Sequence, residues 1–268
     1  MSARTGTRGL HRLMAVTEVF VTSARHQMAV VRAHPLFLVL GILQPLALLL
    51  VMFFARNRPI GAQATAIATA VLLMSYWGAT VWQGAGILRR ERSNGTLGAS
   101  MRGVRSPVLV LAGKSLGATL LPALLTAATV ATTLALLRTP VTIAAPGWYL
   151  LGLVSAILSG TAMGLLLCSL FLLTRFGPQL ASALLYPVFL LAGLLIPPDF
   201  LPPAVRWLGW FVSLRWAQQF LVSAAGGAPD LGSLGLVGIL TCGYIIGGVA
   251  AFRRIDHLVR SRGNLELG

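Results

Sequence analysis

Residues 148–173 read WYLLGLVSAILSGTAMGLLLCSLFLL and contain no charged side chain. A helix of about 20 apolar residues crosses a hydrocarbon layer about 30 Å thick, so this stretch is long enough to span a membrane. Comparable runs recur along the chain, of whose 268 residues 56% are hydrophobic and 10% are charged. A soluble domain carries roughly 25% charged residues. The composition therefore excludes a water-soluble globule and predicts an all-α polytopic membrane protein.

The chain contains six apolar runs, of which this stretch is the fourth. They cover residues 36–54, 62–88, 108–137, 148–173, 179–196 and 231–252. We therefore expect a six-span transmembrane domain over residues 35–252. A cytoplasmic segment, 1–34, precedes this domain, and a basic cytoplasmic tail, 253–268, follows it.

The arginines set the expected orientation, because loops rich in Lys and Arg stay in the cytoplasm. With both termini cytoplasmic, the outer loops hold only Arg56, Arg58, Arg138, Arg206 and Arg215. Every other arginine then lies on the cytoplasmic side. The net charge of +15 would suggest nucleic acid in a soluble chain, but here topology accounts for it. We expect no nucleic-acid partner.

The N-terminal segment is basic, yet apolar side chains recur in it at steps of three or four, as on one face of a helix. These residues are Leu10, Leu13, Met14, Thr17, Phe20, Val21, Ala24 and Met28. Such an amphipathic helix can lie in the interface of an anionic leaflet, with membrane lipids as its partners. The alternative is a solvated helix packed on a partner protein.

The connection 196–230 is too rich in proline to cross a membrane and too apolar for an ordinary loop. Its prolines and aromatic residues are Pro197, Pro198, Phe200, Pro202, Pro203, Trp207, Trp210, Phe211, Trp216 and Phe220. We expect two short helices, 203–211 and 214–225, that lie in the outer interface or re-enter it. The alternative is an aromatic belt with no further role.

Several kinds of chemistry are missing from the sequence. The six runs contain no Asp or Glu, and all four histidines lie outside them, which disfavours a proton- or sodium-coupled carrier. No HExxH motif occurs, and Cys168 and Cys242 lie in apolar runs, so we expect neither a metal site nor a disulfide. Gly113-Lys114-Ser115 lacks the first glycine of a phosphate-binding loop, because Val108 stands there. We expect no enzyme activity, and we expect Lys114 to reach the cytoplasmic headgroups.

Pairs of glycines four residues apart recur in the apolar runs. They are Gly113 with Gly117, Gly160 with Gly164, and Gly243 with Gly247. Small residues at this spacing let helices approach closely in lipid. We expect packing within one chain, and a dimer surface is the alternative for any one pair.

The segment between the second and third runs, 89–107, reads RRERSNGTLGASMRGVRSP. It is short, amphipathic, charged and joined at both ends to membrane helices. A soluble partner that moves such a segment must also move both spans, so the segment is a candidate coupling helix. The alternative is a solvated basic loop.

At these residues the chain resembles the permease subunits of type-2 ATP-binding-cassette exporters, in particular the daunorubicin-resistance-like bacterial branch. The matching positions are Glu91, Gly95, Thr96, Leu97, Ser106 and Pro107. Residues 193–203, GLLIPPDFLPP, are similar to the stretch that forms outer re-entrant helices in that family. The chain departs from the family at Gly98, where a second acid is common, and at Ser213, where a proline is common.

The resemblance implies a half-sized permease in a bacterial cytoplasmic (inner) membrane. Two such subunits, identical or related, would pair and bind two copies of an ATPase subunit, which would hold ATP and Mg; this chain would hold no cofactor. The implied coupling residues are Arg90, Glu91, Arg92, Gly95, Thr96, Leu97 and Met101. The implied outer-gate residues are Pro197, Phe200, Pro202, Trp207 and Trp210.

The expected pathway between two permeases has apolar walls with few polar groups. Its candidate residues are Gln44, Tyr76, Trp77, Trp82, Gln83, Gln179 and Tyr186. Such walls suit an amphipathic or hydrophobic compound, such as a drug, antibiotic, lipid or glycolipid, better than an ion. The chain would then act in efflux and multidrug or antibiotic resistance. The alternatives are a non-transporting membrane anchor for a cytoplasmic enzyme and a nucleotide-independent facilitator.

Overall fold

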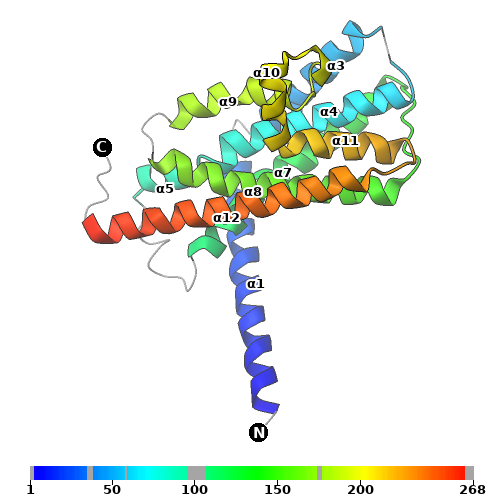
Figure 1. Cartoon of the computed structure of the whole chain (residues 1–268). Helices are drawn as coiled ribbons and strands as arrows, with labels where there is room; N and C mark the ends of the chain where they lie inside the picture. Colours follow the sequence, from blue (N-terminus) through cyan, green and yellow to red (C-terminus); the bar gives the residue numbers. More distant parts are fainter. Residues whose placement is uncertain (1–2, 35–38, 58, 96–106, 174–176, 263–268) are drawn as a thin grey trace.

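The computed structural model describes residues 3–34, 39–57, 59–95, 107–173 and 177–262, and every regular element in them is a helix. The longest are α1 (Ala3–Arg32), α7 (Pro107–Leu136), α8 (Pro146–Leu173) and α12 (Leu231–Arg262). Figure 1 shows α7, α8 and α12 running along a common direction, together with α4 (Ala62–Ala79). The all-α prediction is confirmed for the described residues.

Four stretches are long and apolar enough to cross a membrane: Ala62–Glu91, Pro107–Leu136, Pro146–Phe171 and Leu231–Arg254. Two shorter apolar helices, Gly41–Ala55 and Gln179–Leu191, stand where the first and fifth spans are predicted. At 1.5 Å per residue the longer of these two reaches only about 22 Å, against a hydrocarbon layer of about 30 Å. The chain is an integral membrane protein, and the six-span arrangement stays a prediction.

The helix at the predicted fifth span is α9 (Gly177–Leu191), and it ends five residues before the predicted boundary at 196. Gly193 adopts the left-handed backbone, with φ +73°. The amide of Leu194 then donates to the carbonyl of Phe189 over 3.1 Å, which is the closing bond of a Schellman motif. A glycine near the end of an apolar run therefore stops this helix, although the apolar sequence continues.

Helix α4 forms the centre of the bundle. It packs against α7, α8, α11 (Ser213–Ala225) and α3 (Gln44–Ala55), and its side chains from Ile67 to Ala79 are buried with few gaps. Its many alanines let these neighbours approach closely. By contrast, α12 packs mainly on α8 and α11 and exposes Ile239 and Ile246. Its outer face is apolar, as expected for a helix in contact with lipid.

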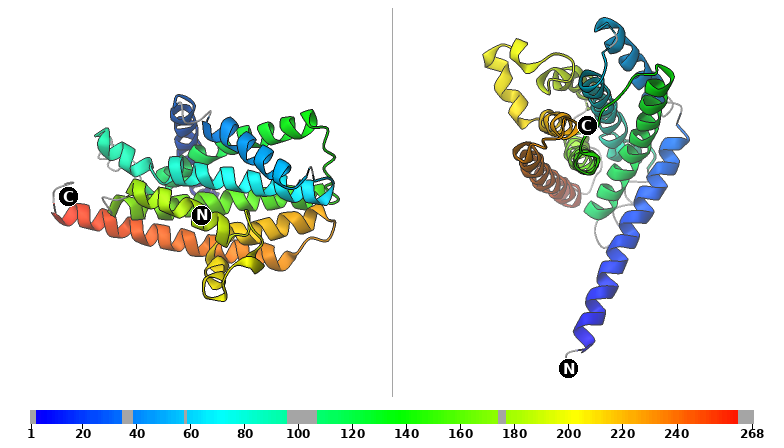
Figure 2. Two further views of the ribbon diagram at one scale, coloured as in Figure 1. Left: turned by 90° about the horizontal axis from the view of Figure 1, so that it is seen from above. Right: turned by 90° about the vertical axis from the view of Figure 1, so that its right-hand side faces the viewer.

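Helix α1 lies across the bundle rather than along it, and its N-terminal half projects beyond the other helices (Figures 1 and 2). Its C-terminal half packs on α7, where Ala24 and Val31 are buried. A helix over Ala3–Arg32 agrees with the predicted helix, whereas its place at a membrane interface stays a prediction. A helix perpendicular to the spans lies parallel to a bilayer surface, so the geometry is compatible with an interfacial position.

The proline-rich connection forms four short helical pieces. They are η3 (Pro198–Phe200), α10 (Pro203–Arg206), η4 (Trp207–Phe211) and α11. The hydroxyl of Tyr244, on α12, donates to the carbonyl of Phe211 over 2.6 Å and accepts from the amide of Ser213 at 3.2 Å. This residue fixes the bend between η4 and α11. Short helices at 203–211 and from 213 agree with the sequence prediction, whereas their depth in a membrane stays a prediction.

The N-terminus of α12 is capped by Asp230. Its carboxylate accepts hydrogen bonds from the amides of Gly232 (3.0 Å) and Ser233 (3.4 Å), from the Ser233 hydroxyl (2.6 Å) and from Gln219 (3.1 Å). These bonds, those of Ser233 foremost, hold the pKa of Asp230 below its usual value. A carboxylate at this position satisfies amides that have no partner within the helix.

Asp230→Ala is therefore expected to lower the thermal stability of the chain at pH 7. Because the folded-state pKa is lowered, the carboxylate stabilises the fold above the pKa of the unfolded chain, near 3.9. That stabilisation is lost as pH falls through the folded-state value. Thermal unfolding in detergent should show a gap between wild type and variant at pH 7 that closes at acid pH. A gap of equal size at all pH values would contradict this role.

Candidate functional site

The expected single helix over 62–88 is interrupted by a π-helical turn, η2 (Thr80–Gly84), before α5 (Ile87–Ser93). The amide of Ala85 donates to the carbonyl of Thr80 over 2.9 Å, five residues back. Such a turn inserts one residue into the helix and leaves carbonyls without their usual partners. It shifts α5 relative to α4, and no apolar or charge pattern in the sequence indicates it.

Arg90 returns from α5 to this turn. Its guanidinium donates to the carbonyl of Trp82 over 3.3 Å and to the carbonyl of Gln83. Gly86 makes room for this contact, because a Cβ there would lie 2.8 Å from Nη1 of Arg90. Arg90 therefore holds α5 to the π-turn and thereby to the buried second span.

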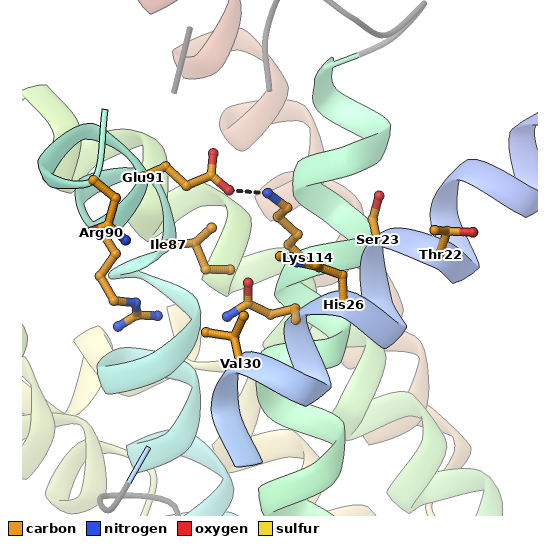
Figure 3. Close-up of a pocket in the computed structure, with 10 residues that line it drawn as sticks. Thr22, Ser23, His26, Val30, Ile87, Arg90, Glu91 and Lys114 are labelled. Atoms are coloured by element: carbon orange, nitrogen blue, oxygen red, sulfur yellow. Dashed lines mark hydrogen bonds and ion pairs between the residues drawn. The ribbon is translucent and has the colours of Figure 1, made fainter. Parts of the chain in front are cut away.

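Glu91, the next residue, joins α5 to α7. Its carboxylate forms an ion pair with the ammonium of Lys114, drawn as the dashed line in Figure 3, and the two side chains are only 14% and 12% exposed. Removing one partner of such a mostly buried pair leaves an uncompensated charge. The expectation that Lys114 reaches lipid headgroups is thus corrected: the nearby carboxylate binds its ammonium within the protein.

Helix α1 packs on α7 next to this ion pair. A Cβ on Gly113 would lie 2.5 Å from the carbonyl oxygen of Phe20, and one on Gly117 would lie 2.2 Å from that of Ala24. The backbones of α1 and α7 therefore touch at these glycines, on either side of Lys114. The pair Gly113 and Gly117 packs within the chain, as expected. Gly160 and Gly164 do likewise, against Tyr76 and Ser115, whereas a Cβ on Gly243 would meet nothing within 4 Å.

A cavity of about 520 Å³ lies between α1, α5 and α7. Polar and charged side chains line most of it: Thr22, Ser23, His26 and Gln27 from α1, Arg90, Glu91 and Asn94 from the α5 side, and Lys114 from α7. Figure 3 shows the Lys114 and Glu91 side chains pointing toward each other between α7 and α5, with His26 of α1 beside them. A polar recess where three helices meet can accept side chains of a docking protein. We call the place where residues 22–30 of α1, residues 87–94 and Lys114 of α7 meet the coupling corner.

Gly95 ends α5. It has φ +70°, a left-handed conformation that glycine adopts without a steric cost. The amide of Asn94 still donates to the carbonyl of Arg90 over 3.0 Å, so helical hydrogen bonding continues to the residue directly before this glycine. The resemblance named Gly95 as a motif residue, and its backbone angle supplies a physical reason for a glycine there.

Gly95→Ala is expected to destabilise the chain by about 1 kcal/mol, because an L residue pays roughly that much in the left-handed region. Gly95→Asn should cost less, since Asn adopts this region more readily. Gly235→Ala is the matched control, because that glycine is helical with nothing within 4 Å of its Cβ position. Thermal unfolding in detergent measures all three. Equal stability of Gly95→Ala and wild type would show that this turn does not require a glycine.

Of the other predicted coupling residues, Arg92 lies in α5, where only its backbone is described. Thr96, Leu97 and Met101 fall within 96–106, outside the described residues. Lys114 was not among the predicted coupling residues. A signal for it existed, since it is the only lysine in the chain and follows the only acid of the segment by 23 residues. Sequence distance alone does not show that the two helices meet.

The predicted pathway residues do not gather at one surface. Tyr76, Trp77 and Gln83 are buried inside the bundle, and the Tyr76 hydroxyl donates to the carbonyl of Ile157 over 2.7 Å. Gln44 lies against Gly78. The exposed members are Trp82, Gln179 and Tyr186. Within one chain, only this exposed group is placed to face lipid or a second subunit.

The predicted outer-gate residues are all exposed: Pro197, Phe200, Pro202, Trp207 and Trp210. Trp207 packs edge-on against Phe211, and Trp210 against Trp216, whose indole also donates to the carbonyl of Trp210 over 3.1 Å. The short helices are therefore held by their own aromatic contacts. Among the described residues no group of three His, Cys, Asp or Glu could hold a metal ion.

A comparison with protein families matches residues 17–225 to the ABC-2 type transporter family. The matched region runs from within α1 to the end of α11 and contains the coupling corner. The chain belongs to this family. The ABC-2 domain is a transport component, so the chain is the permease component of an ABC transporter, a class that typically pairs with an ATPase subunit. A comparison with curated proteins gives no significant match.

Proposed function

We propose that this ABC-2 permease is the membrane subunit of an ATP-driven exporter and that its ATPase subunit docks at the coupling corner. The observation that carries this proposal is the Glu91–Lys114 ion pair, which joins α5 to α7 at the point where α1 contacts α7. A push on α5 acts on the second span, which α5 continues, on α7 through the ion pair, and on α1, which packs on α7.

The complete exporter contains two permease subunits and two ATPase subunits in this proposal. It lies in a bacterial inner membrane with both permease termini in the cytoplasm, which puts the basic end of the bundle on the ATPase side, in accord with the positive-inside bias. The ATPase subunits bind ATP and Mg and carry out the hydrolysis. Six crossings require the two short helices, Gly41–Ala55 and Gln179–Leu191, to pass through a locally thinned layer.

The cargo is an amphipathic or hydrophobic compound, a class that includes drugs, antibiotics and lipids. The four described long spans contain no Asp or Glu away from Glu91 at the end of one of them, and such spans offer no relay for protons or cations. The exposed pathway candidates Trp82, Gln179 and Tyr186 combine apolar area with few hydrogen-bonding groups, as suits an amphipathic solute.

The test is reconstitution of the permease in proteoliposomes with an ABC ATPase subunit that co-purifies with it. A panel of a cationic dye, an uncharged glycolipid and an anionic phospholipid analogue serves as cargo. We expect ATP-dependent movement of at least one compound and none with an ATPase that lacks its Walker lysine. Movement without nucleotide would indicate a facilitator instead. ATPase binding without movement of any compound would indicate an anchor.

A further inference from the structure

Residues of α3, α4, α11 and the turn after α9 line a second cavity, of about 380 Å³. These elements meet toward the end of the bundle away from α5 (Figure 1). The charged lining residues of the cavity are Arg56, which follows α3, and Arg215, near the start of α11. These are two of the few arginines that the predicted topology places on the outer side. Since arginine is depleted from outer loops, their convergence on one cavity calls for a function.

Within the part of the chain that the structure describes, neither arginine has a carboxylate partner. Among the described residues the ion pairs are Glu91–Lys114 and Asp199–Arg206, so Asp199, an acid on the same predicted side of the membrane, is already paired with Arg206. Arg215 donates only to the carbonyl of Arg206, over 3.4 Å, and lies over the Trp216 ring at 5.5 Å. Asp230, which is bonded to the lining residue Gln219, is occupied in capping α12. Among its described lining residues the cavity therefore has two positive charges and no acid.

The other described lining residues of this cavity are uncharged, and most are apolar. The apolar wall includes Met52, Ile67 and Leu194, which are buried. Gln218, which also lines the cavity, donates through Nε2 to the carbonyl of Ala66 over 3.2 Å. Guanidinium groups bind phosphate and carboxylate oxygens in forked geometry, and an apolar wall beside them accommodates a hydrocarbon chain.

We propose that this cavity binds the anionic head, phosphate or carboxylate, of an amphiphile, with Arg56 and Arg215 on the head and the apolar wall along the start of its chain. The inference rests on the proposed export function and makes its cargo class more definite: an anionic amphiphile near the outer end of its route. The same chemistry could be supplied by a bilayer lipid, a single-chain amphiphile or a free anion.

Native mass spectrometry of the purified full-length chain tests this without ATP or the ATPase. The probes are phosphatidylglycerol, dodecyl phosphate and inorganic phosphate, with phosphatidylcholine as the zwitterionic reference. We expect R56Q/R215Q to weaken binding of the anionic amphiphiles by about tenfold or more, because each guanidinium supplies a charge-assisted hydrogen bond. R138Q is the matched control, since Arg138 is an outer arginine that lines a different cavity. It should bind as wild type does.

The three anionic probes distinguish the possible sources of the anionic head group. Binding of phosphatidylglycerol and dodecyl phosphate supports a lipid-like ligand, and binding of dodecyl phosphate alone supports a single-chain cargo. Inorganic phosphate bound as tightly as either would contradict a role for the apolar wall. Equal binding by wild type and R56Q/R215Q, or a preference for phosphatidylcholine, would overturn the proposal. Should R56Q/R215Q fail to fold, R56K/R215K keeps the charge, and the wild-type preference for anionic over zwitterionic lipid still decides.

Failure here and failure of the export function are distinguishable. If the arginine variants bind normally while ATP-dependent transport of another compound is observed, the cavity proposal is wrong and the export function stands. If binding depends on the arginines but no compound moves with ATP, the cavity is a lipid site on a chain that does not export.

Discussion

Glu91→Lys is expected to reduce ATP-driven transport at least tenfold while ATP binding by the partner subunit persists. The substitution sets two ammonium groups together where a mostly buried ion pair stood, and cutting such a pair costs about 3 kcal/mol or more even without the repulsion. Helix α5 should then separate from α7, so that movement of α5 no longer reaches the third span. Transport and ATP hydrolysis measured on the same proteoliposomes would show hydrolysis without matching transport.

A charge-swapped double variant tests whether Glu91 and Lys114 act together. Lys114→Glu alone should uncouple as strongly as Glu91→Lys, and the double variant E91K/K114E should recover much of the lost transport, because the pair is re-formed in reverse. Asp199→Lys provides the control, since the Asp199–Arg206 pair is long, at 3.9 Å, with side chains 90% and 46% exposed. Exposed pairs contribute about 0 to 1 kcal/mol. Strictly additive effects in the double variant would show that the two residues do not act together.

Gly117→Ala is expected to have the second large effect. The new Cβ would lie 2.2 Å from the carbonyl oxygen of Ala24, a backbone atom that cannot turn aside as a side chain could. Helix α1 must therefore shift, and such overpacking costs typically about 1 to 3 kcal/mol. We expect a lower unfolding temperature in detergent and faster tryptic cleavage at Arg25, which is exposed on α1.

Gly243→Ala is the matched control on another long apolar helix. Nothing lies within 4 Å of its Cβ position, and alanine favours a helix by up to about 1 kcal/mol over glycine. The two substitutions, chemically identical, should therefore change stability in opposite directions. If Gly117→Ala were as stable as Gly243→Ala and its α1 equally resistant to trypsin, the close contact of α1 with α7 would be excluded.

The apolar runs predicted the helices well because burial in lipid selects composition over many residues. Most boundaries lie within a few residues of the prediction, and the exceptions have local causes. The run ending at 196 stops at Leu191 because Gly193 turns left-handed, and the run from 62 to 88 is interrupted at Thr80 by a π-turn. Both are local features of the backbone, which an apolar pattern averaged over several turns does not indicate.

The site was predictable in part for a related reason. The segment 89–107 was identifiable from its charge and its position, and Gly95 from the resemblance. The partner of Glu91 was not, because Lys114 pairs with it only once α5 and α7 are folded against each other. The sequence likewise did not indicate that Arg56 and Arg215, far apart along the chain, line one cavity. Both the Glu91–Lys114 pair and the shared cavity depend on contacts between helices that are far apart in the sequence.

The most direct test of the account is where the ATPase touches the permease. A photoreactive p-benzoylphenylalanine at Asn94, exposed at the end of α5, should cross-link to the ATPase in the assembled complex. The same residue at Trp207, which is 56% exposed in η4, should not. Cross-linking from position 207 with none from position 94 would place the ATPase at the wrong end of the bundle and contradict the account.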